Sequence, residues 1–225
     1  MNKILKDALA LTAITVVIGL LLGVVYEVTK DPIARQELKA KQEACEEVFP
    51  DADTFESVDI SGETDTFRSA LDEAGYTAQT IDEVYQALDG SGELAGYVIT
   101  VTSSEGYGGD IQFSMGVGID GTTYGISFLS IEETAGLGMN ADTDAFKSQF
   151  KDQNVSEFTY SKTGASAEGE IDALSGATIT TNAVTNGVNA GLCVFRVFFF
   201  QDSKCYIQIL SMLERSHAVF HGKHP

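Results

Sequence analysis

Residues 8–26 form an uninterrupted run of 19 residues without a charged side chain, and this run limits most strongly how the chain can fold. At the helical rise of about 1.5 Å per residue, it reaches across most of a bilayer core of roughly 30 Å. A buried core helix would be shorter and amphipathic. A cleaved signal peptide would end in small residues of the A-x-A type, whereas this run ends in Gly23-Val24-Val25-Tyr26. The sequence therefore predicts a retained transmembrane helix over 8–26.

Charged residues on the two sides of the run predict its orientation. Lys3 and Lys6 precede it, and Glu27 and Asp31 follow it together with Lys30. Because basic residues stay on the cytoplasmic side of a membrane, we expect residues 1–7 in the cytoplasm. The remaining chain is then expected outside a cell membrane that is crossed once.

The formal net charge of -19 limits the classes of partner that the protein can bind. Such a surface repels nucleic acid, and the sequence holds no basic patch to offset it. It also disfavours adsorption to anionic lipid headgroups. We therefore expect membrane attachment through the apolar run and no nucleic-acid partner.

The placement of histidine and cysteine excludes several kinds of catalytic site. All three histidines lie in the last nine residues, and the three cysteines, Cys45, Cys193 and Cys205, form no C-x-x-C pair. Neither a Ser-His-Asp or Cys-His site, nor a histidine-based metal site, nor a disulfide framework is supported. A pair of catalytic carboxylates stays open by composition, although acidic runs are typical of solvated surface. The reactivity of this domain is therefore expected to come from a cofactor.

The remaining patterns predict an α+β fold. Asp31-Pro32 is typical of a helix start, so residues 27–50 are expected to contain a stalk helix. Alternating apolar residues predict antiparallel strands at 82–88, 94–102, 111–119 and 123–131, with a tight turn at Asp120-Gly121. A short helix is expected at 141–150 and a last helix from about Thr181. The outer domain is thus expected to span 51–191, with an antiparallel sheet flanked by helices.

The segment 172–181, DALSGATITT, combines small residues with hydroxyl groups and leads into the predicted last helix. A helix N-terminus offers unpaired N–H groups and about half a positive charge, which suits a phosphate. Gly176 and Ala177 leave room for a ligand to approach the backbone closely. The segment therefore favours a ligand that contains phosphate, in a domain that would otherwise repel one.

The pattern Asp172-x-x-Ser175-Gly176-Ala177-Thr178 resembles the flavinylation motif of FMN-binding domains. These domains occur in the G subunit of the Rnf electron-transport complex and in the C subunit of the sodium-pumping NADH:quinone oxidoreductase. The resemblance implies that Thr178 receives FMN in phosphoester linkage from a separate flavin transferase of the ApbE type, which consumes FAD. It also implies that Asp172, Ser175, Gly176 and Ala177 are recognition residues, and it implies neither a catalytic residue nor a metal site.

Two further loops match the same family in the same order along the chain. Gly106-Tyr107-Gly108-Gly109 precedes the strand predicted at 111–119, and Glu132-Glu133-Thr134-Ala135-Gly136-Leu137-Gly138 follows the strand predicted at 123–131. Ala135 stands where the family usually has proline, which predicts a somewhat less rigid loop. The resemblance covers roughly residues 5–192 and implies possible FMN contacts at Tyr107, Gly108, Gly109, Glu133, Thr134, Gly136, Leu137, Gly138, Thr180 and Thr181.

The resemblance implies an electron-transfer subunit with covalent FMN in a membrane-bound, ion-translocating ferredoxin:NAD+ oxidoreductase, with the other Rnf subunits as partners. Two alternatives stay open, the C subunit of the quinone reductase and a membrane-anchored binding or adhesion domain without a redox role. Residues 192–225 form an atypical tail in which Arg196, Asp202 and Lys204 argue against a second membrane span. We expect this tail to be a membrane-surface or partner-facing segment, a poorly ordered extension or a sequence artefact.

Overall fold

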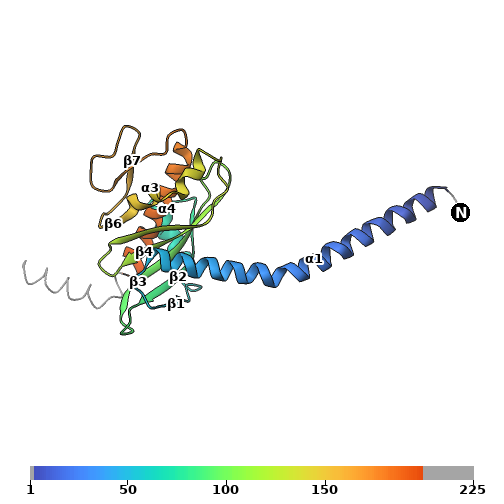
Figure 1. Cartoon of the computed structure of the whole chain (residues 1–225), viewed down its shortest axis with the longest axis horizontal. Coiled ribbons are helices and arrows are strands. Elements are labelled where there is room, and N and C mark those ends of the chain that lie inside the picture. Colours follow the sequence, from blue (N-terminus) through green and yellow to red (C-terminus); the bar gives the residue numbers. More distant parts are fainter. Residues whose placement is uncertain (1–2, 200–225) are drawn as a thin grey trace, which may run out of the picture. The chain divides into compact units, whose positions relative to one another are not determined.

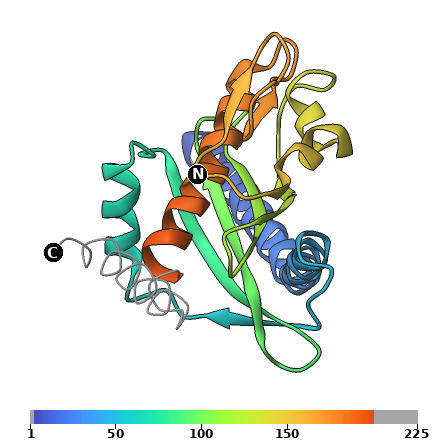
Figure 2. The same cartoon turned by 90° about the vertical axis from the view of Figure 1, so that its left-hand side faces the viewer.

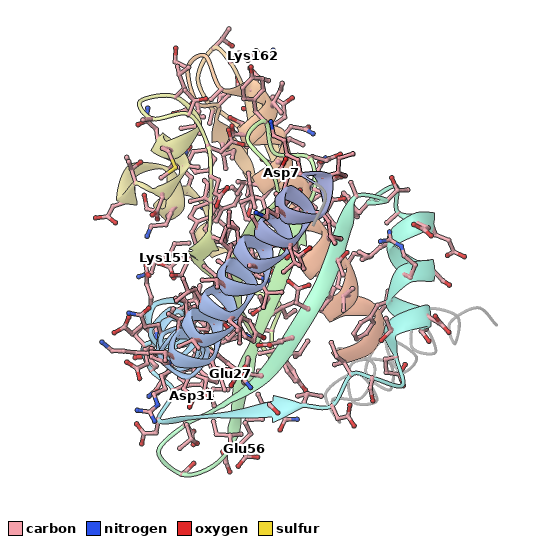
Figure 3. The ribbon with its side chains drawn as sticks, turned by 90° about the vertical axis from the view of Figure 1, so that its right-hand side faces the viewer. Asp7, Glu27, Asp31, Glu56, Lys151 and Lys162 are labelled. Atoms are coloured by element: carbon pink, nitrogen blue, oxygen red, sulfur yellow. The ribbon has the colours of Figure 1, made fainter. Side chains whose placement is uncertain are left out.

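The apolar run lies within one long helix, α1 (Lys3–Val48), in the computed structural model, which describes residues 3–199 (Figure 1). Among these residues, α1 contains the one stretch that is long and apolar enough to cross a membrane. Its large apolar side chains are exposed, with Leu11, Leu20 and Leu22 each at 65%. The acids Asp7, Glu27 and Asp31 bracket the run along α1 (Figure 3). A helix that is apolar on all sides and is covered by no other part of residues 3–199 is typical of a membrane span.

The stalk helix predicted to begin at Asp31-Pro32 is a continuation of α1, because the helix runs through Pro32 without a break. Proline lacks the N–H that would bond to the carbonyl four residues earlier, and its ring crowds that carbonyl. Only the hydrogen bond of this one residue is lost, and the bonds on both sides of Pro32 keep the helix continuous. The chain divides into two units, Met1–Gln42 with the apolar run and Glu43–Pro225 with the outer domain.

The outer unit is built on a six-stranded antiparallel sheet with the strand order β1-β2-β3-β4-β5-β6. Four strands correspond to the predicted ones, and their bounds are β2 (Gln79–Leu88), β3 (Leu94–Ser103), β4 (Ile111–Gly118) and β5 (Thr123–Ser130). The turn predicted at Asp120-Gly121 joins β4 to β5, where Gly121 has a φ of 86° and donates its N–H to the Gly118 carbonyl. The predicted fold class, an N-terminal membrane helix followed by an α+β domain with an antiparallel sheet, is confirmed.

The larger core lies between the sheet and α4 (Thr178–Val194), which crosses one face of the sheet with α2 (Thr64–Glu73) beside it (Figure 2). Phe113 and Met115 of β4 point into this core together with Val184 and Val188 of α4. Gly191 lies over Met115, whose sulfur atom occupies the space that a Cβ at this position would need. Because Gly191 has no side chain, α4 can lie close to β4.

The last turn of α1 packs on the opposite face of the sheet. Cys45, Val48 and Phe49 form a small apolar cluster with Ala87 of β2 and Val98 of β3, and each of the five is at most 3% exposed. Val98 points away from α4 because side chains alternate between the two faces of a strand. The end of the predicted stalk helix is therefore part of the folded domain.

A polar network secures the same turn of α1. The Ser127 hydroxyl donates to Oε2 of Glu47 at 2.6 Å, and Nζ of Lys147 donates to Oε1 at 2.9 Å. Lys147 also lies 3.4 Å from Oδ1 of Asp142. Burial acts to raise the pKa of the Glu47 carboxyl, but the hydrogen bonds from Ser127 and Lys147 and the lysine charge outweigh it, so the pKa is lowered.

Several elements differ from the sequence prediction. The helix expected at 141–150 is divided into η1 (Gly138–Asp142), α3 (Asp144–Lys147) and η2 (Ser148–Phe150). The last helix begins three residues earlier than expected, at Thr178. The segment expected to form a tail begins inside the core, because Leu192, Val194 and Phe195 are each at most 1% exposed. Residues 200–225, with the predictions made for them, lie outside the described residues.

The smaller elements complete the outer unit. They are β1 (Thr54–Val58), β6 (Lys151–Gln153), β7 (Thr159–Ser161), β8 (Glu170–Asp172) and η3 (Phe195–Phe199). β7 and β8 pair in parallel as a separate two-stranded sheet, and the loop between them carries Lys162 at the opposite end of the outer unit from Glu56 on β1 (Figure 3). The chain leaves β8 directly into the segment that starts α4.

Candidate functional site

Three loops that are far apart in the sequence enclose one cavity of about 560 Å³ in the outer unit. They connect β3 to β4, β5 to η1 and β8 to α4. The volume lies within the range of about 300–1,000 Å³ that is usual for small-molecule sites. The cavity is lined by Tyr107, Glu133, Thr134, Leu137, Gly138, Gly176, Ala177, Thr178, Ile179 and Thr180. The three segments singled out in the sequence therefore meet at one place.

Thr178 is the first residue of α4 and is half-buried at the wall of the cavity. Its hydroxyl group has no hydrogen-bond partner among residues 3–199. Ala177 occupies the N-cap position, and no side chain caps the helix there. Since the first N–H groups of a helix have no carbonyl partner within it, this end of α4 presents both unpaired donors and a free hydroxyl.

The loop before Thr178 is held in shape by Thr181. Leu174 donates its N–H to Oγ1 of Thr181 at 3.0 Å, and the same hydroxyl donates to the Ala177 carbonyl at 3.0 Å. Gly176 between them has a φ of 74°, in the left-handed region that glycine adopts without strain. Thr181 is fully buried, so its hydroxyl supports the loop from within and is not part of the cavity wall.

The other residues of the predicted motif lie at the start of this loop. The Asp172 carboxylate accepts the N–H of Ala165 at 2.5 Å, and its own N–H donates to Oε1 of Gln149 at 2.6 Å. Ser175 is exposed and, like Asp172, is not among the lining residues. Of the five motif residues, Gly176, Ala177 and Thr178 thus border the cavity, and Asp172 orders the segment that leads to it.

Glu133 joins two of the three loops. Its side chain is 9% exposed, and its Oε1 accepts the N–H of Tyr107 at 2.7 Å. Gly138 lies against it, because a Cβ at this position would be 2.6 Å from Oε2 of Glu133 and 2.6 Å from Oγ1 of Thr180. The glycine therefore brings the η1 loop close to the first turn of α4.

The remaining predicted contacts shape the loops and, apart from Thr134, do not line the cavity. Gly108 packs against the Glu132 carbonyl, which leaves no room for a side chain. Gly109 and Gly136 have φ values of 146° and 76°, as turns with a positive φ require. Thr134 is exposed at the cavity wall, and its carbonyl accepts the N–H of Leu137 at 3.1 Å.

Two features of the site were not predicted from the sequence. Ile179 is 53% exposed and lines the cavity next to Thr178. Its position directly after the motif could have indicated this role. Glu105 accepts hydrogen bonds from Asn186 at 2.7 Å, from Gln79 at 3.0 Å and from Asn182 at 3.4 Å. This carboxylate ties the start of the Tyr107 loop to α4, and the spacing of the two asparagines by one helical turn could have indicated a shared partner.

The chemistry of the wall fits FMN. Tyr107, Leu137 and Ile179 present exposed apolar surface of 71%, 42% and 53%, which suits a flat aromatic ring. The start of α4 suits a phosphate because of its unpaired N–H groups. No lysine or arginine is among the described residues that line the cavity, and no group of three or more potential metal ligands occurs among residues 3–199.

Comparisons with known proteins agree with this geometry. Residues 106–192 match the family described as FMN-binding domain, and residues 1–48 match the family described as RnfG N-terminal region. The chain is 31% identical to the G subunit of the Na(+)-translocating ferredoxin:NAD(+) oxidoreductase complex of Acetobacterium woodii, over 86% of this chain and 92% of that protein.

A second relative is the G subunit of the proton-translocating ferredoxin:NAD(+) oxidoreductase complex of Clostridium ljungdahlii, 32% identical over 83% of this chain and 89% of that protein. Among solved structures, the C subunit of the Na(+)-translocating NADH-quinone reductase of Parabacteroides distasonis is 22% identical, with a TM-score of 0.48 over 68% of this chain and 80% of that chain. From the matched families and the two relatives, we conclude that this chain belongs to the family of G subunits of ion-translocating ferredoxin:NAD(+) oxidoreductase complexes and carries an FMN-binding domain.

Proposed function

We propose that this protein transfers electrons as the G subunit of a membrane-bound, ion-translocating ferredoxin:NAD+ oxidoreductase and holds FMN covalently through Thr178. The observation that carries the proposal is the Thr178 hydroxyl, which lines the cavity at the first residue of α4 and has no hydrogen-bond partner among residues 3–199. Membership of the subunit family and the FMN-binding domain support the electron-transfer role. FMN supplies the reversible uptake and release of electrons.

The electrostatics of the cavity favour an ester linkage over a freely bound phosphate. A free flavin phosphate carries up to two negative charges, while the wall has no lysine or arginine and the protein has a net charge of -19. Esterification to Thr178 removes one of these charges and replaces binding energy by a bond. The unpaired N–H groups at the start of α4 then stabilise the remaining charge.

The attachment requires FAD and a separate flavin transferase of the ApbE type. The Thr178 oxygen forms a bond to the FMN phosphorus, and the pyrophosphate bond of FAD breaks. AMP leaves, and the hydroxyl proton passes to a base of the transferase or to solvent. Thr178 is therefore a tether, and Asp172, Ser175, Gly176 and Ala177 present it to the transferase.

Within the cavity, each wall has its own part in holding the cofactor. Tyr107, Leu137 and Ile179 offer apolar surface for the isoalloxazine ring, while Thr134 and Thr180 offer polar groups. Gly108, Gly109 and Gly136 give the loops their shape, and Thr181 supports the loop before the tether.

The linkage is tested by producing the protein together with a flavin transferase and examining the denatured product. We expect yellow protein whose flavin fluorescence survives denaturing electrophoresis and whose intact mass is increased by one esterified FMN. Thr178→Val is expected to lose this adduct, and Thr178→Ser is expected to keep it because the hydroxyl is retained. An adduct that persists in Thr178→Val would show that another residue is the acceptor.

Thr159→Val is the matched control, because Thr159 is an exposed threonine outside the motif that does not line the cavity. We expect this variant to keep the covalent flavin. Unmodified mass and colourless protein in the wild type would favour an anchored binding domain without a redox role.

We propose, in addition, that residues 8–26 span the cell membrane, that residues 1–7 are cytoplasmic and that the FMN-binding domain lies outside. The domain predicted over 51–191 also includes the buried residues of the stalk end from Glu43 and of the segment 192–195. Lys3 and Lys6 before the run, and Glu27 and Asp31 after it, support this orientation. Protease added to intact spheroplasts is expected to degrade the outer domain without lysis. Degradation that requires lysis would place the domain on the cytoplasmic side.

A further inference from the structure

Two buried polar side chains face the cavity with hydrogen-bonding capacity left over. Glu133 is 9% exposed and Thr180 is 1% exposed, and both line the cavity. Oε1 of Glu133 accepts the Tyr107 N–H, but no donor among residues 3–199 reaches its Oε2. The Thr180 hydroxyl has no hydrogen-bond partner in the same range. The two residues are buried, but these two atoms open to the cavity, so a ligand there would satisfy them.

The two free groups converge on one place. A Cβ at Gly138 would lie 2.6 Å from Oε2 of Glu133 and 2.6 Å from Oγ1 of Thr180, so both atoms border the same Cα. One comes from the loop after β5 and the other from the first turn of α4. Their juxtaposition is therefore produced by the fold and is not a local turn.

The two groups have complementary hydrogen-bonding roles. An ionised carboxylate only accepts hydrogen bonds, whereas a hydroxyl can also donate one. A ligand edge that offers an N–H next to a carbonyl oxygen satisfies both. The isoalloxazine ring has such an edge in its imide group.

We propose that Glu133 and Thr180 are positioning residues for the imide edge of the flavin ring and that the Glu133 carboxylate lowers the reduction potential of the bound flavin. This inference rests on the proposed function, because it requires FMN in this cavity. The carboxylate accepts the imide N–H, and the Thr180 hydroxyl donates to the neighbouring carbonyl. Reduction adds negative charge to the ring, so a buried carboxylate beside it opposes reduction.

The test uses the full-length flavinylated protein in detergent and the isosteric variant Glu133→Gln. The amide keeps an oxygen that accepts the Tyr107 N–H, and it removes the charge. The midpoint potential is measured by titration with dithionite in the presence of mediator dyes, so that the electrons come from dithionite and the protons from solvent. We expect the reduced form to be stabilised at least tenfold, which corresponds to a rise of about 30 mV for a two-electron couple.

Glu132→Gln is the matched control, since Glu132 is the less buried neighbour and loses the same charge. Its side chain does not line the cavity, and solvent screens its charge, so we expect a much smaller shift. Equal shifts in the two variants would overturn the proposal, because the effect would then come from overall charge.

A second measurement separates positioning from a purely structural role. A ring held in one orientation gives visible circular dichroism, and we expect this signal to decrease in both Glu133→Gln and Thr180→Val. Wild-type signals in both variants would overturn the proposal even if their stability falls. If Glu133→Gln does not fold, the circular dichroism of Thr180→Val alone tests the positioning role.

The outcome stays distinct from that of the proposed linkage. Denaturing electrophoresis reports whether the flavin is covalent, independently of its potential. If the wild type lacks a covalent flavin, the same potentials and spectra are compared at saturating free FMN. A shift that is specific to Glu133→Gln there supports the positioning role, and its absence contradicts it.

Discussion

Gly138 lines the cavity at a position where one added methyl group would meet two other residues of the cavity wall. A Cβ there would lie 2.6 Å from both Glu133 Oε2 and Thr180 Oγ1 and 2.8 Å from Cβ of Glu133, so these two side chains or the loop that carries Glu133 must shift. Overpacking of this kind costs about 1–3 kcal/mol. We predict that Gly138→Ala lowers the flavin content per protein and the free energy of unfolding in urea.

Gly62→Ala provides the comparison, because a Cβ at Gly62 would meet no atom within 4 Å. This variant is expected to keep both the flavin content and the stability of the wild type. Normal flavin content in Gly138→Ala would show that the cavity adapts more freely than its geometry indicates.

Cys45 is expected to be chemically silent in the folded protein. Burial raises the pKa of its thiol to about 11, with added repulsion from Glu83 and Glu46, and the side chain is 3% exposed. The reactive thiolate is therefore scarce at neutral pH. We predict that iodoacetamide modifies Cys45 slowly in native protein and rapidly in denaturant, as followed by peptide mass. Equally fast modification in both states would contradict the burial of this turn.

The motif residues show what a sequence can and cannot predict. The positions of Thr178 and the two glycine-containing loops could be predicted because their spacing along the chain carries the resemblance. The roles of Thr181 and Glu105 could not, because each depends on partners that the fold brings near. Periodicity gives no information on which hydroxyl faces a cavity and which one supports a loop.

The ion pair between Glu47 at the end of α1 and Lys147 of α3 is expected to stabilise the fold. Lys147 bonds to Glu47 at 2.9 Å, and its side chain is 15% exposed while that of Glu47 is 50% exposed. We predict that Lys147→Met lowers the free energy of unfolding by about 1 kcal/mol near neutral pH, because the pair is partly screened by solvent. Lys162→Met is the control, since Lys162 has no ion pair among residues 3–199. A loss of the same size in the control would contradict a specific role for the pair.

The contribution of the Glu47–Lys147 pair to the free energy of unfolding is expected to decrease as the pH falls. Burial acts to raise the pKa of Glu47 in the folded protein. The hydrogen bonds from Ser127 and Lys147 outweigh this effect, so the pKa is lowered. A carboxyl group of this kind stabilises the fold above its unfolded pKa of about 4.3, and the contribution is lost as the pH falls through the folded value. The difference between wild type and Lys147→Met in urea unfolding should therefore shrink in acid. A difference that persists there would indicate lost packing of the lysine stem.

The predictability of the elements depends on their length and pattern. The four long strands and α4 could be predicted because alternation and helical spacing extend over eight residues or more. β6, β7 and β8 have three residues each, too few for any period to be recognised. α2 buries only Phe67 and Leu71, and two apolar positions do not distinguish a helix from a loop. The predicted start of α4 was wrong because Thr178 and Thr180 fit a loop as well as a first helical turn.

For the whole molecule, the boundary between the two units predicts where the chain can be shortened. The outer unit begins at Glu43 and includes the buried turn with Cys45, Val48 and Phe49. We predict that a chain beginning at Glu43 folds and accepts flavin, while one beginning at Pro50 is less stable by about 5 kcal/mol, because it lacks two large buried apolar side chains and exposes the sheet residues that they cover. Thermal unfolding and flavin content of the two shortened proteins provide the test. Equal stability would mean that the turn adds nothing to the domain.

The burial of that turn also has a mechanical consequence. Because Val48 and Phe49 pack against Ala87 of β2 and Val98 of β3, a force applied at Glu43, the start of the outer unit, acts first on these two strands. We therefore expect the outer unit, when pulled from Glu43 in optical tweezers, to resist until the contact between this turn and the sheet breaks.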